Sequence, residues 1–355
     1  MQVESFLKES VDRRASDIYI IEKKPITFKV NGNMEYFDSN TLGGAQTEEI
    51  LRALYSLAGG RDFNKLASGD DDFAVSVAGV GRFRVNAYRQ RLSYASVIRT
   101  IPMGLPDPAK LNIPEVIVNL ANYTRGIVLF TGTTGSGKST SLACLIDKIN
   151  STRQDHIITI EDPVEFQHEH KTGIVSQREL EADTHGYVSA LRAAMRQVPD
   201  VILVGEMRDY ETISAAITAA ETGHLVFSTL HTIGAAATID RIIDVFPPNQ
   251  QNQIRTQLSV TLQAVVSQQL IPTLEGKRLP AYEIMIVNSA IRNLIRENKT
   301  FQIENIIQTS ASLGMKTMDM SIYDLYRQKN ISKENALLFS VNQQTMASRI
   351  SGQAR

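Results

Sequence analysis

The sequence predicts an α/β protein of two domains, a small α+β domain followed by a larger α/β domain with a mostly parallel sheet. A chain of 355 residues is longer than one hydrophobic core usually organises. Short apolar runs that alternate with helical stretches indicate parallel strands covered by helices. Residues 101–114 contain four prolines, which remove backbone donors and disfavour helix. We therefore expect domains over 1–100 and 115–355, joined by a Pro-rich linker over 101–114.

The N-terminal domain is expected to combine two helices with several strands. Apolar residues recur at helical spacing at the start of the chain, and β-like runs follow. The dipeptide Asn31-Gly32 favours the positive φ angles of a tight hairpin. The expected helices lie near 3–11 and 47–57, and the expected strands cover 16–22, 26–30, 34–37, 72–78, 82–91 and 94–101.

The second domain is expected to alternate strands and helices and then to become helical. The expected strands cover 126–130, 156–160, 201–204 and 225–230, with a helix over 141–150. From about 249 to 355 helical patterns dominate, so we expect a helical C-terminal region there. Cys144, the one cysteine of the chain, falls in the helix over 141–150 and is interpreted as a small buried hydrophobe.

Composition excludes some functions and locations. The 37 Lys and Arg residues balance 38 Asp and Glu residues, so no general positive field attracts nucleic acid or anionic lipid, and only a local basic patch stays open. No apolar run approaches the ~18 residues of a membrane span. The start Met-Gln-Val-Glu-Ser lacks the basic and apolar regions of a leader, and we expect a cytoplasmic protein.

The segment from Gly132 to Ser139 fits the P-loop pattern G-x-x-x-x-G-K-[ST]. An apolar run precedes it and a helical stretch follows, which is the context that a P-loop requires. Its glycines let backbone N–H groups turn toward phosphate, Lys138 reaches the β and γ phosphates, and Ser139 ligates Mg²⁺. The chain is therefore expected to bind ATP or GTP with Mg²⁺. The expected nucleotide-binding residues are Thr133, Thr134, Gly135, Ser136, Gly137, Lys138, Ser139 and Thr140.

Acidic residues follow two of the expected strands. Glu161 and Asp162 follow the run over 157–160, and Glu206 follows the run over 201–204. Ligands of open α/β sheets bind at the carboxyl ends of the strands, so both acids should face the phosphates beside Lys138. We expect Glu161 to orient the attacking water and Glu206 to lie near Mg²⁺. The strand-end rule alone leaves the exchange of these two roles open.

Histidines bracket the apolar run over 225–230. A strand of this length separates His224 from His231 by about 23 Å, so the two cannot ligate one metal ion. His231 is expected at the level of the acids, where it would hydrogen-bond a γ-phosphate or a neighbouring carboxylate as a sensor of the nucleotide state. For His224 a structural or subunit-contact role stands beside a catalytic one. His168-Glu169-His170 has no third ligand at a sensible spacing and is interpreted as an exposed loop.

Arginines are dense in the N-terminal domain, at Arg82, Arg84, Arg89, Arg91 and Arg99. One interpretation is a solvated sheet face or an RNA-binding strand, but no pair of stacking aromatic residues accompanies them. A sharper interpretation, in a P-loop enzyme, is a set of arginine fingers that reach the nucleotide of an adjacent subunit.

Taken together, the motifs resemble those of the secretion-type hexameric ATPases related to RecA, and within them the type IV pilus retraction ATPases. The matching segments, beside the P-loop, are A-S-D-I-Y-I at 15–20, G-R-F-R-V-N at 81–86, I-E-D-P-V-E at 160–165, V-G-E-M-R-D at 204–209, T-G-H-L-V-F-S-T-L-H-T at 222–232 and A-I-R-N-L-I-R-E at 290–297. The last segment looks like the signature of the retraction enzymes. The cysteine-rich insert of the assembly enzymes is absent from the sequence.

The resemblance implies a PAS-like N-terminal domain, a RecA-like ATPase domain and a cytoplasmic homohexamer that hydrolyses ATP to retract a pilus. It implies arginine fingers at Arg84 and Arg99, and a partner in the inner-membrane platform protein of the pilus machinery. Two positions depart from the family pattern: Val198, where an acid is common, and Ser228, where Gly is common. Neither departure removes a group assigned to catalysis.

The segment 290–297 places Ile291, Leu294 and Ile295 on one helical face, which a core-facing helix also explains. Arg292 and Arg296 repel each other at i, i+4, which favours an acidic partner on another subunit or in the pilus machinery. Two alternatives stay open for the whole chain, a weakly active accessory pilus ATPase and a RecA-like nucleic-acid translocase. The neutral charge disfavours the translocase.

Overall fold

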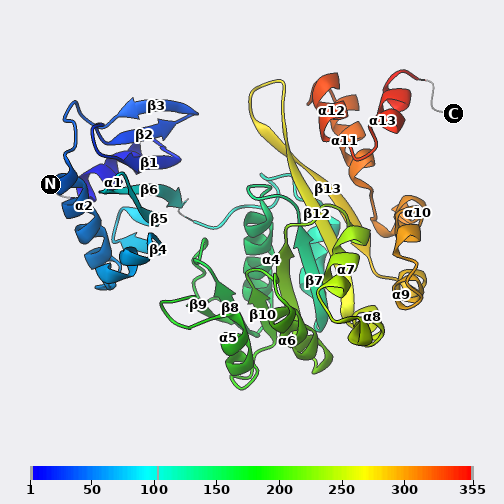
Figure 1. The fold of residues 1–355 in the computed structure, drawn as a ribbon. Coiled ribbons are helices and arrows are strands. Elements are labelled where there is room, and N and C mark those ends of the chain that lie inside the picture. Colours follow the sequence, from blue (N-terminus) through cyan, green and yellow to red (C-terminus); the bar gives the residue numbers. More distant parts are fainter. Residues whose placement is uncertain (1–2, 102–103, 353–355) are drawn as a thin grey trace. The chain divides into compact units, whose positions relative to one another are not determined.

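The computed structural model describes residues 3–101 and 104–352, which form two compact units (Figure 1). The first unit comprises Met1–Gly104 together with Pro163–Phe166, and the second comprises Leu105–Asp162 and Gln167–Arg355. The short segment Pro163–Phe166 thus groups with residues far from it in sequence, and the guanidinium of Arg82 donates a hydrogen bond to the carbonyl of Val164 at 3.0 Å within that unit.

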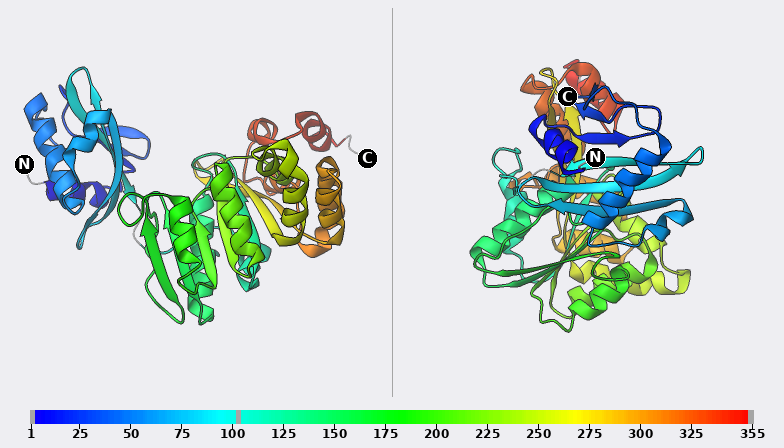
Figure 2. Two further views of the ribbon diagram at one scale, coloured as in Figure 1. Left: turned by 60° about the horizontal axis from the view of Figure 1, so that its bottom comes forward. Right: turned by 90° about the vertical axis from the view of Figure 1, so that its left-hand side faces the viewer.

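The first unit is a six-stranded antiparallel sheet with helices on one face (Figure 2). Its elements are α1 (Val3–Asp12), β1 (Asp17–Ile20), β2 (Thr27–Val30), β3 (Asn33–Tyr36), α2 (Gly44–Leu57), the 3₁₀ helix η1 (Phe63–Ser68), β4 (Asp70–Val77), β5 (Gly81–Gln90) and β6 (Ser93–Ile101). The strand order is β3-β2-β1-β6-β5-β4. The predicted hairpin is confirmed, because Val30 pairs with Asn33 across Asn31 and Gly32, whose φ angles are 50° and 87°.

Alternation along β5 explains which face of this sheet is covered. Phe83, Val85 and Ala87 are fully buried and pack against α1 and α2, whereas the residues between them are half-buried on the opposite face. The period of two therefore directs Arg82 and Arg84 of β5 away from the core.

The second unit is a seven-stranded sheet in the order β13-β12-β7-β11-β10-β8-β9. Its strands are β7 (Gly126–Thr131), β8 (His156–Glu161), β9 (Ile174–Glu179), β10 (Val201–Val204), β11 (Leu225–Leu230), β12 (Leu262–Pro272) and β13 (Arg278–Ile286). All neighbours run parallel except β12 and β13, which form an antiparallel hairpin. The central strands are buried on both faces, as the continuous apolar runs predict.

Helices cover both faces of this sheet (Figures 1 and 2). The first face packs against α3 (Glu115–Val118), the 3₁₀ helix η2 (Asn119–Asn122) and α4 (Lys138–Thr152). The second face packs against α5 (Tyr187–Ala194), α6 (Tyr210–Glu221), α7 (Ala235–Asp244), α8 (Pro248–Thr261), α9 (Ser289–Arg296), η3 (Thr300–Gln302) and α10 (Ile303–Thr309). After η4 (Ala311–Leu313), helices α11 (Met318–Arg327), α12 (Lys333–Phe339) and α13 (Gln343–Ile350) pack on the far end of the β12–β13 hairpin.

The prediction of a helical region from about 249 to 355 is wrong for residues 262–286, which form β12 and β13. No Gly or Pro separates α8 from β12, since Thr261 ends the helix and Leu262 begins the strand. Strand β12 also carries Ser267, Gln268 and Gln269, which weaken its apolar pattern, and pairing with both β7 and β13 stabilises it instead. Strand β9 was not predicted either, because it lies at the sheet edge and is mostly polar.

No helix within residues 3–101 and 104–352 is long and apolar enough to cross a membrane.

Candidate functional site

The P-loop connects the end of β7 to the start of α4. Gly132, Gly135 and Gly137 have φ angles of 136°, 77° and 91°, which only glycine adopts readily. A Cβ on Gly132 would lie 2.3 Å from the backbone carbonyl oxygen of Gln268. A Cβ on Gly137 would lie 2.7 Å from the side-chain nitrogen Nε2 of Gln268. At Gly132 and Gly137 the loop therefore passes so close to Gln268 of β12 that no side chain fits.

The loop has the features of a phosphate site. Lys138 is the first residue of α4, where a cation is unfavourable unless an anion is bound nearby. Its Nζ donates to the carbonyl oxygens of Gly132 at 2.8 Å and Thr133 at 3.0 Å, so the amine is held over the loop. The hydroxyl of Ser136 is buried with no hydrogen-bond partner among the described residues. Thr133, Thr134 and Ser139 are exposed beside it. These residues fit a nucleoside triphosphate.

A cavity of about 440 Å³ lies next to this loop within the second unit. Thr140 and Ser141 of α4 line one side, and Gln268 of β12 with Pro280 and Tyr282 of β13 line another. Ser141 donates to Gln268 Oε1 at 2.9 Å, which joins α4 to the hairpin. The mixed polar and apolar lining suits a nucleoside. The sequence interpretation missed this wall because it took residues 262–286 as helical.

The predicted acids lie at the carboxyl ends of their strands, on the side of the sheet where the P-loop begins. Strands β8, β10, β11 and β7 are parallel and in register, so Glu161, Glu206 and His231 follow neighbouring strand ends. Glu206 accepts from Arg208 Nε at 2.7 Å, and its other carboxylate oxygen is 3.4 Å from His231 Nε2. The expected level of His231 is thus confirmed.

Glu161 is oriented by neighbouring polar side chains. Thr159 Oγ1 donates to Glu161 Oε1 at 2.7 Å, and Gln177 Nε2 of β9 donates to the same oxygen at 3.4 Å. Thr159 is fully buried. The carboxylate therefore has a defined orientation on the α4 side of the sheet.

Tyr187 adds a hydroxyl that the sequence interpretation missed. A Cβ on Gly205 would lie 3.0 Å from the Tyr187 hydroxyl and 3.4 Å from the Cα of Glu161, so the hydroxyl lies between the ends of β8 and β10. Burial and then the charges of Glu206, Asp162 and Glu161 raise the pKa of Tyr187, which keeps the phenol protonated. Tyr187 begins a helix about 26 residues after Glu161, and no sequence motif marks it.

His224 lies at the opposite end of β11 from His231. Its Nδ1 is 2.8 Å from the carbonyl oxygen of Ala219, and its own carbonyl accepts from the backbone of Gly126 at 3.0 Å. Within one chain, His224 therefore lies at the opposite end of the sheet from Glu161 and Glu206.

Arg82, Arg84 and Arg99 of the first unit lie on the uncovered face of its sheet. Arg84 and Arg99 are paired across β5 and β6, and their guanidinium groups approach Asp72 at 3.6 Å and Asp17 at 3.2 Å. Their side chains remain 36% and 67% exposed, so both stay available to a further anion. Arg82 instead bonds to Ser76 and to the carbonyl of Val164.

The interpretation of His168-Glu169-His170 as an exposed loop is wrong for His168. Glu169 and His170 are exposed, but His168 is half-buried and its Nδ1 has no hydrogen-bond partner among the described residues. Burial lowers the pKa of His168 to about 4. Among the residues that the structure describes, no group of three or more His, Cys, Asp and Glu side chains is placed to hold a metal ion.

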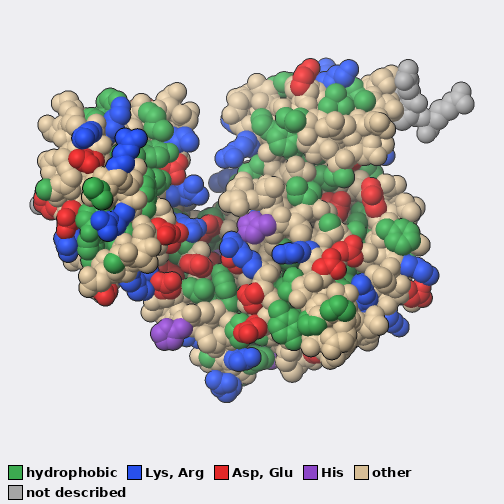
Figure 3. All heavy atoms as spheres, viewed as in Figure 1, with side chains coloured by type: hydrophobic (Ala, Val, Ile, Leu, Met, Phe, Trp, Pro, Cys, Tyr) green, Lys and Arg blue, Asp and Glu red, His purple; other side chains and the backbone are tan. Residues whose placement is uncertain are grey.

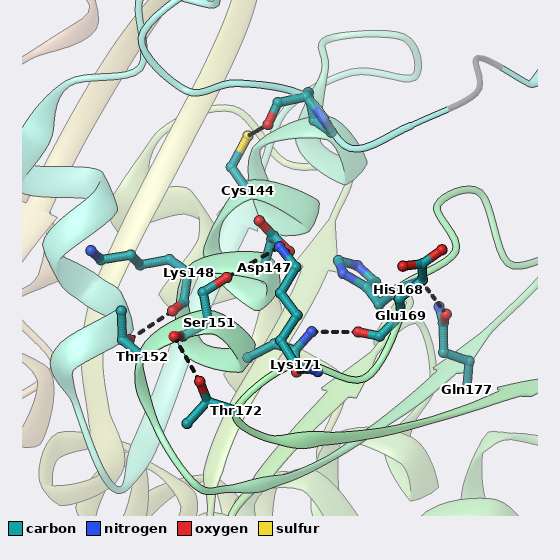
Figure 4. Close-up of polar contacts among 12 residues, drawn as sticks. Cys144, Asp147, Lys148, Ser151, Thr152, His168, Glu169, Lys171, Thr172 and Gln177 are labelled. Atoms are coloured by element: carbon teal, nitrogen blue, oxygen red, sulfur yellow. Dashed lines mark hydrogen bonds and ion pairs between the residues drawn. The ribbon is translucent and has the colours of Figure 1, made fainter.

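Cys144 is buried in α4, as predicted (Figure 4), and its thiol donates to the carbonyl of Pro106 at 3.4 Å. Burial raises the pKa of this thiol to about 12, so it is unreactive at neutral pH.

Helix α9 packs Ile291 and Ile295 into the core and Leu294 against it, as the helical spacing predicts. The predicted outward role of Arg292 is wrong. Its Nη1 donates to the carbonyls of Ser259 and Val260, each at 2.7 Å, and so caps the end of α8. Arg296 is exposed.

Comparisons with known proteins show the family to which the chain belongs. The family model described as type II/IV secretion system protein matches residues 1–279. The type IV pilus retraction ATPase PilT of Pseudomonas aeruginosa is 46% identical over 336 residues, 95% of this chain and 97% of the relative. The type IV pilus ATPase PilU of the same organism is 39% identical, over 95% of this chain and 88% of the relative.

A crystal structure of the pilus retraction motor PilT with bound ADP has a TM-score of 0.89 and 44% identity, and covers 97% of this chain and 98% of that one. A match over 97% of the chain covers residues of both units. The chain therefore belongs to the type II/IV secretion system protein family, in the branch that PilT represents.

Proposed function

We propose that this chain is an ATP-hydrolysing motor that drives retraction of a type IV pilus, and with it twitching motility. The observation that carries the proposal is the convergence of Lys138, Glu161, Glu206 and His231 at one edge of the sheet, in a chain 46% identical to PilT over nearly its whole length.

The chemistry is divided among these residues. Residues 133–140 and the amine of Lys138 bind the phosphates, and the cavity beside Tyr282 receives the nucleoside. Ser139 and Glu206 would hold Mg²⁺, which neutralises charge on the phosphates. Glu161 orients the attacking water, and its fixed Oε1 supports that role. His231, in contact with Glu206, senses the γ-phosphate.

The quaternary arrangement completes the site. The chain forms a homohexamer in which a PAS-like domain over 1–100, after a linker over 101–114, supplies Arg84 and Arg99 to the RecA-like domain of a neighbour. Their exposed guanidinium groups on one face of the sheet support this role, since an arginine finger must reach an anion outside its own domain. His224, remote from the acids of its own chain, is assigned to a subunit contact.

The motor acts on the cytoplasmic face of the inner membrane, through the platform protein of the pilus machinery. Nucleic acid is not the polymer on which this motor acts. The chain carries a net charge of −1, and on the face shown in Figure 3 acidic and basic side chains intermix without a continuous basic area among the described residues.

A cellular experiment tests this function. Deletion of the gene should abolish twitching and leave pili on the surface, and the wild-type gene should restore retraction whereas Lys138→Ala, at equal expression, should not. Normal twitching and normal pilus numbers in the deletion strain would contradict the proposal.

A further inference from the structure

A chain of hydrogen bonds leads from Glu161 to the P-loop helix α4. Thr159 on β8 and Gln177 on β9 are directly opposite in the parallel pair, and Glu161 follows Thr159 by two residues. All three side chains therefore lie on the same face of the sheet. Thr159 and Gln177 donate to the same oxygen of Glu161, at 2.7 and 3.4 Å, so donors from two strands fix one carboxylate oxygen.

The amide of Gln177 is itself held in one orientation. Its Oε1 accepts a hydrogen bond from the backbone N–H of His168 at 2.8 Å (Figure 4). A backbone N–H can only meet the oxygen of an amide, so the NH₂ group is directed at Glu161. Rotation of the amide would lose both contacts at once.

The loop that holds Gln177 is tied to α4. Buried Asn150 of α4 donates to the carbonyl of Glu169 at 2.7 Å and accepts from the backbone of Lys171 at 3.2 Å. Lys171 Nζ also bonds to Asp147 Oδ1 at 2.5 Å (Figure 4), and Gly173 N–H donates to the Asn150 carbonyl at 3.0 Å. Helix α4 begins at Lys138, so the helix that follows the P-loop anchors the loop that orients Gln177.

The electrostatic surroundings of Glu161 make this amide important. Glu179 of β9 is directly opposite Glu161, and like charges in that position repel. Glu206 follows the adjacent strand β10, Asp162 follows Glu161 in sequence, and Tyr187 is the neutral hydroxyl at the start of α5. A neutral amide donor on β9 favours the charged carboxylate of Glu161 in this acidic cluster.

We propose that Gln177 is a positioning residue for Glu161, and that the loop Gln167–Gly173 makes this positioning depend on the P-loop helix. The inference rests on the proposed role of Glu161 in hydrolysis. A shift of α4 when nucleotide binds would reach the carboxylate through Asn150, the loop and the amide of Gln177.

Substitution of Gln177 in the full-length purified hexamer tests the positioning. Gln177→Leu should lower kcat about tenfold with the Kd for ADP unchanged, because a misplaced group costs rate and not ground-state binding. Gln177→Glu keeps an acceptor for the His168 N–H but places a second carboxylate beside Glu161. It should move the acid limb of the kcat/KM profile to higher pH by about one unit.

Gln167→Glu is the matched control, since it adds the same charge at an exposed position of the loop that contacts Gln177. Its pH profile should equal that of the wild type. An unshifted profile for Gln177→Glu, an equal shift for Gln167→Glu, or loss of ADP binding in both Gln177 variants would overturn the inference.

A double-mutant cycle tests the coupling to α4. Lys171→Ala loosens the loop and should lower kcat two- to threefold, but not when Gln177 is already Leu. Additive losses would contradict the coupling. Absence of wild-type ATPase activity, or a normal rate for Glu161→Gln, would instead contradict the proposed function on which the inference rests.

Discussion

Arg84 of β5 and Arg99 of β6 are directly opposite each other in an antiparallel strand pair. Like charges in this position repel, and the contacts with Asp72 and Asp17 offset the repulsion only in part because all four groups are accessible to solvent to some degree. Both residues lie on one face of the sheet, with the guanidinium of Arg84 directed toward β4 and that of Arg99 toward β1.

Loss of either arginine should reduce turnover strongly. An arginine finger contributes on the order of 10³ to 10⁵ in kcat, so Arg99→Ala should be nearly inactive in a steady-state assay. If the fingers act between subunits, mixed hexamers of Lys138→Ala and Arg99→Ala should regain part of the activity, since some sites then combine an intact Lys138 with an intact Arg99. Failure to recover activity at any mixing ratio, with co-assembly demonstrated, would exclude the arrangement.

Arg292→Ala should destabilise the protein, whereas Arg296→Ala should not. Arg292 satisfies two carbonyls at the end of α8, and loss of such charged hydrogen bonds costs about 1–3 kcal/mol. Exposed Arg296 should change the free energy of unfolding by less than about 0.5 kcal/mol. Urea unfolding measures the change in the free energy of unfolding for each variant. Equal changes would contradict the capping of α8 by Arg292. Arg296→Ala is then the cleaner variant for testing a contact with pilus machinery in cells.

Stability should fall in acid partly through His168. Its pKa in the folded protein is about 4, below the ordinary value of 6.5, so the unfolded chain takes up a proton first as the pH falls. The contribution of neutral His168 is complete above about pH 6.5 and is lost toward pH 4, by at most about 3 kcal/mol. His168→Phe should therefore lose less stability than the wild type between about pH 7 and pH 5. Parallel pH dependences of the two proteins would show that His168 titrates normally.

Val198→Asn should stabilise the protein. Val198 has a φ angle of 52° and is 85% exposed, so a β-branched residue occupies the left-handed region without burial to compensate. Asn tolerates that region, and the gain should be about 1 kcal/mol. Val341 is similarly exposed with no positive φ, so Val341→Asn serves as the control and should give no gain. An unchanged melting temperature for Val198→Asn would show that the strain is absent in solution.

Local patterns predicted the parts of the site that depend on chain neighbours. The P-loop, the Asn31-Gly32 hairpin and the strand-end positions of Glu161, Glu206 and His231 follow from short-range rules about turns and parallel strands. Each rule needs only a few consecutive residues, so one sequence is enough.

Contacts between distant segments were beyond such rules. Strand β12 is held by its partners on both sides, and Gln268 closes on the P-loop from 131 residues away along the chain, as counted from Gly137 to Gln268. Arg292 has the spacing of an outward-facing residue, yet its acceptors belong to α8. Gln177 and Tyr187 carry no motif and are recognised only when the sheet brings them to Glu161.

The most direct test of the account is the Mg²⁺-dependent ATPase rate of the purified hexamer. The wild type should hydrolyse ATP, Lys138→Ala should abolish turnover, and Glu161→Gln should retain nucleotide binding while hydrolysis slows by about 10² or more. Near-normal rates in both folded, hexameric variants would contradict the assignment of this sheet edge as the ATPase site.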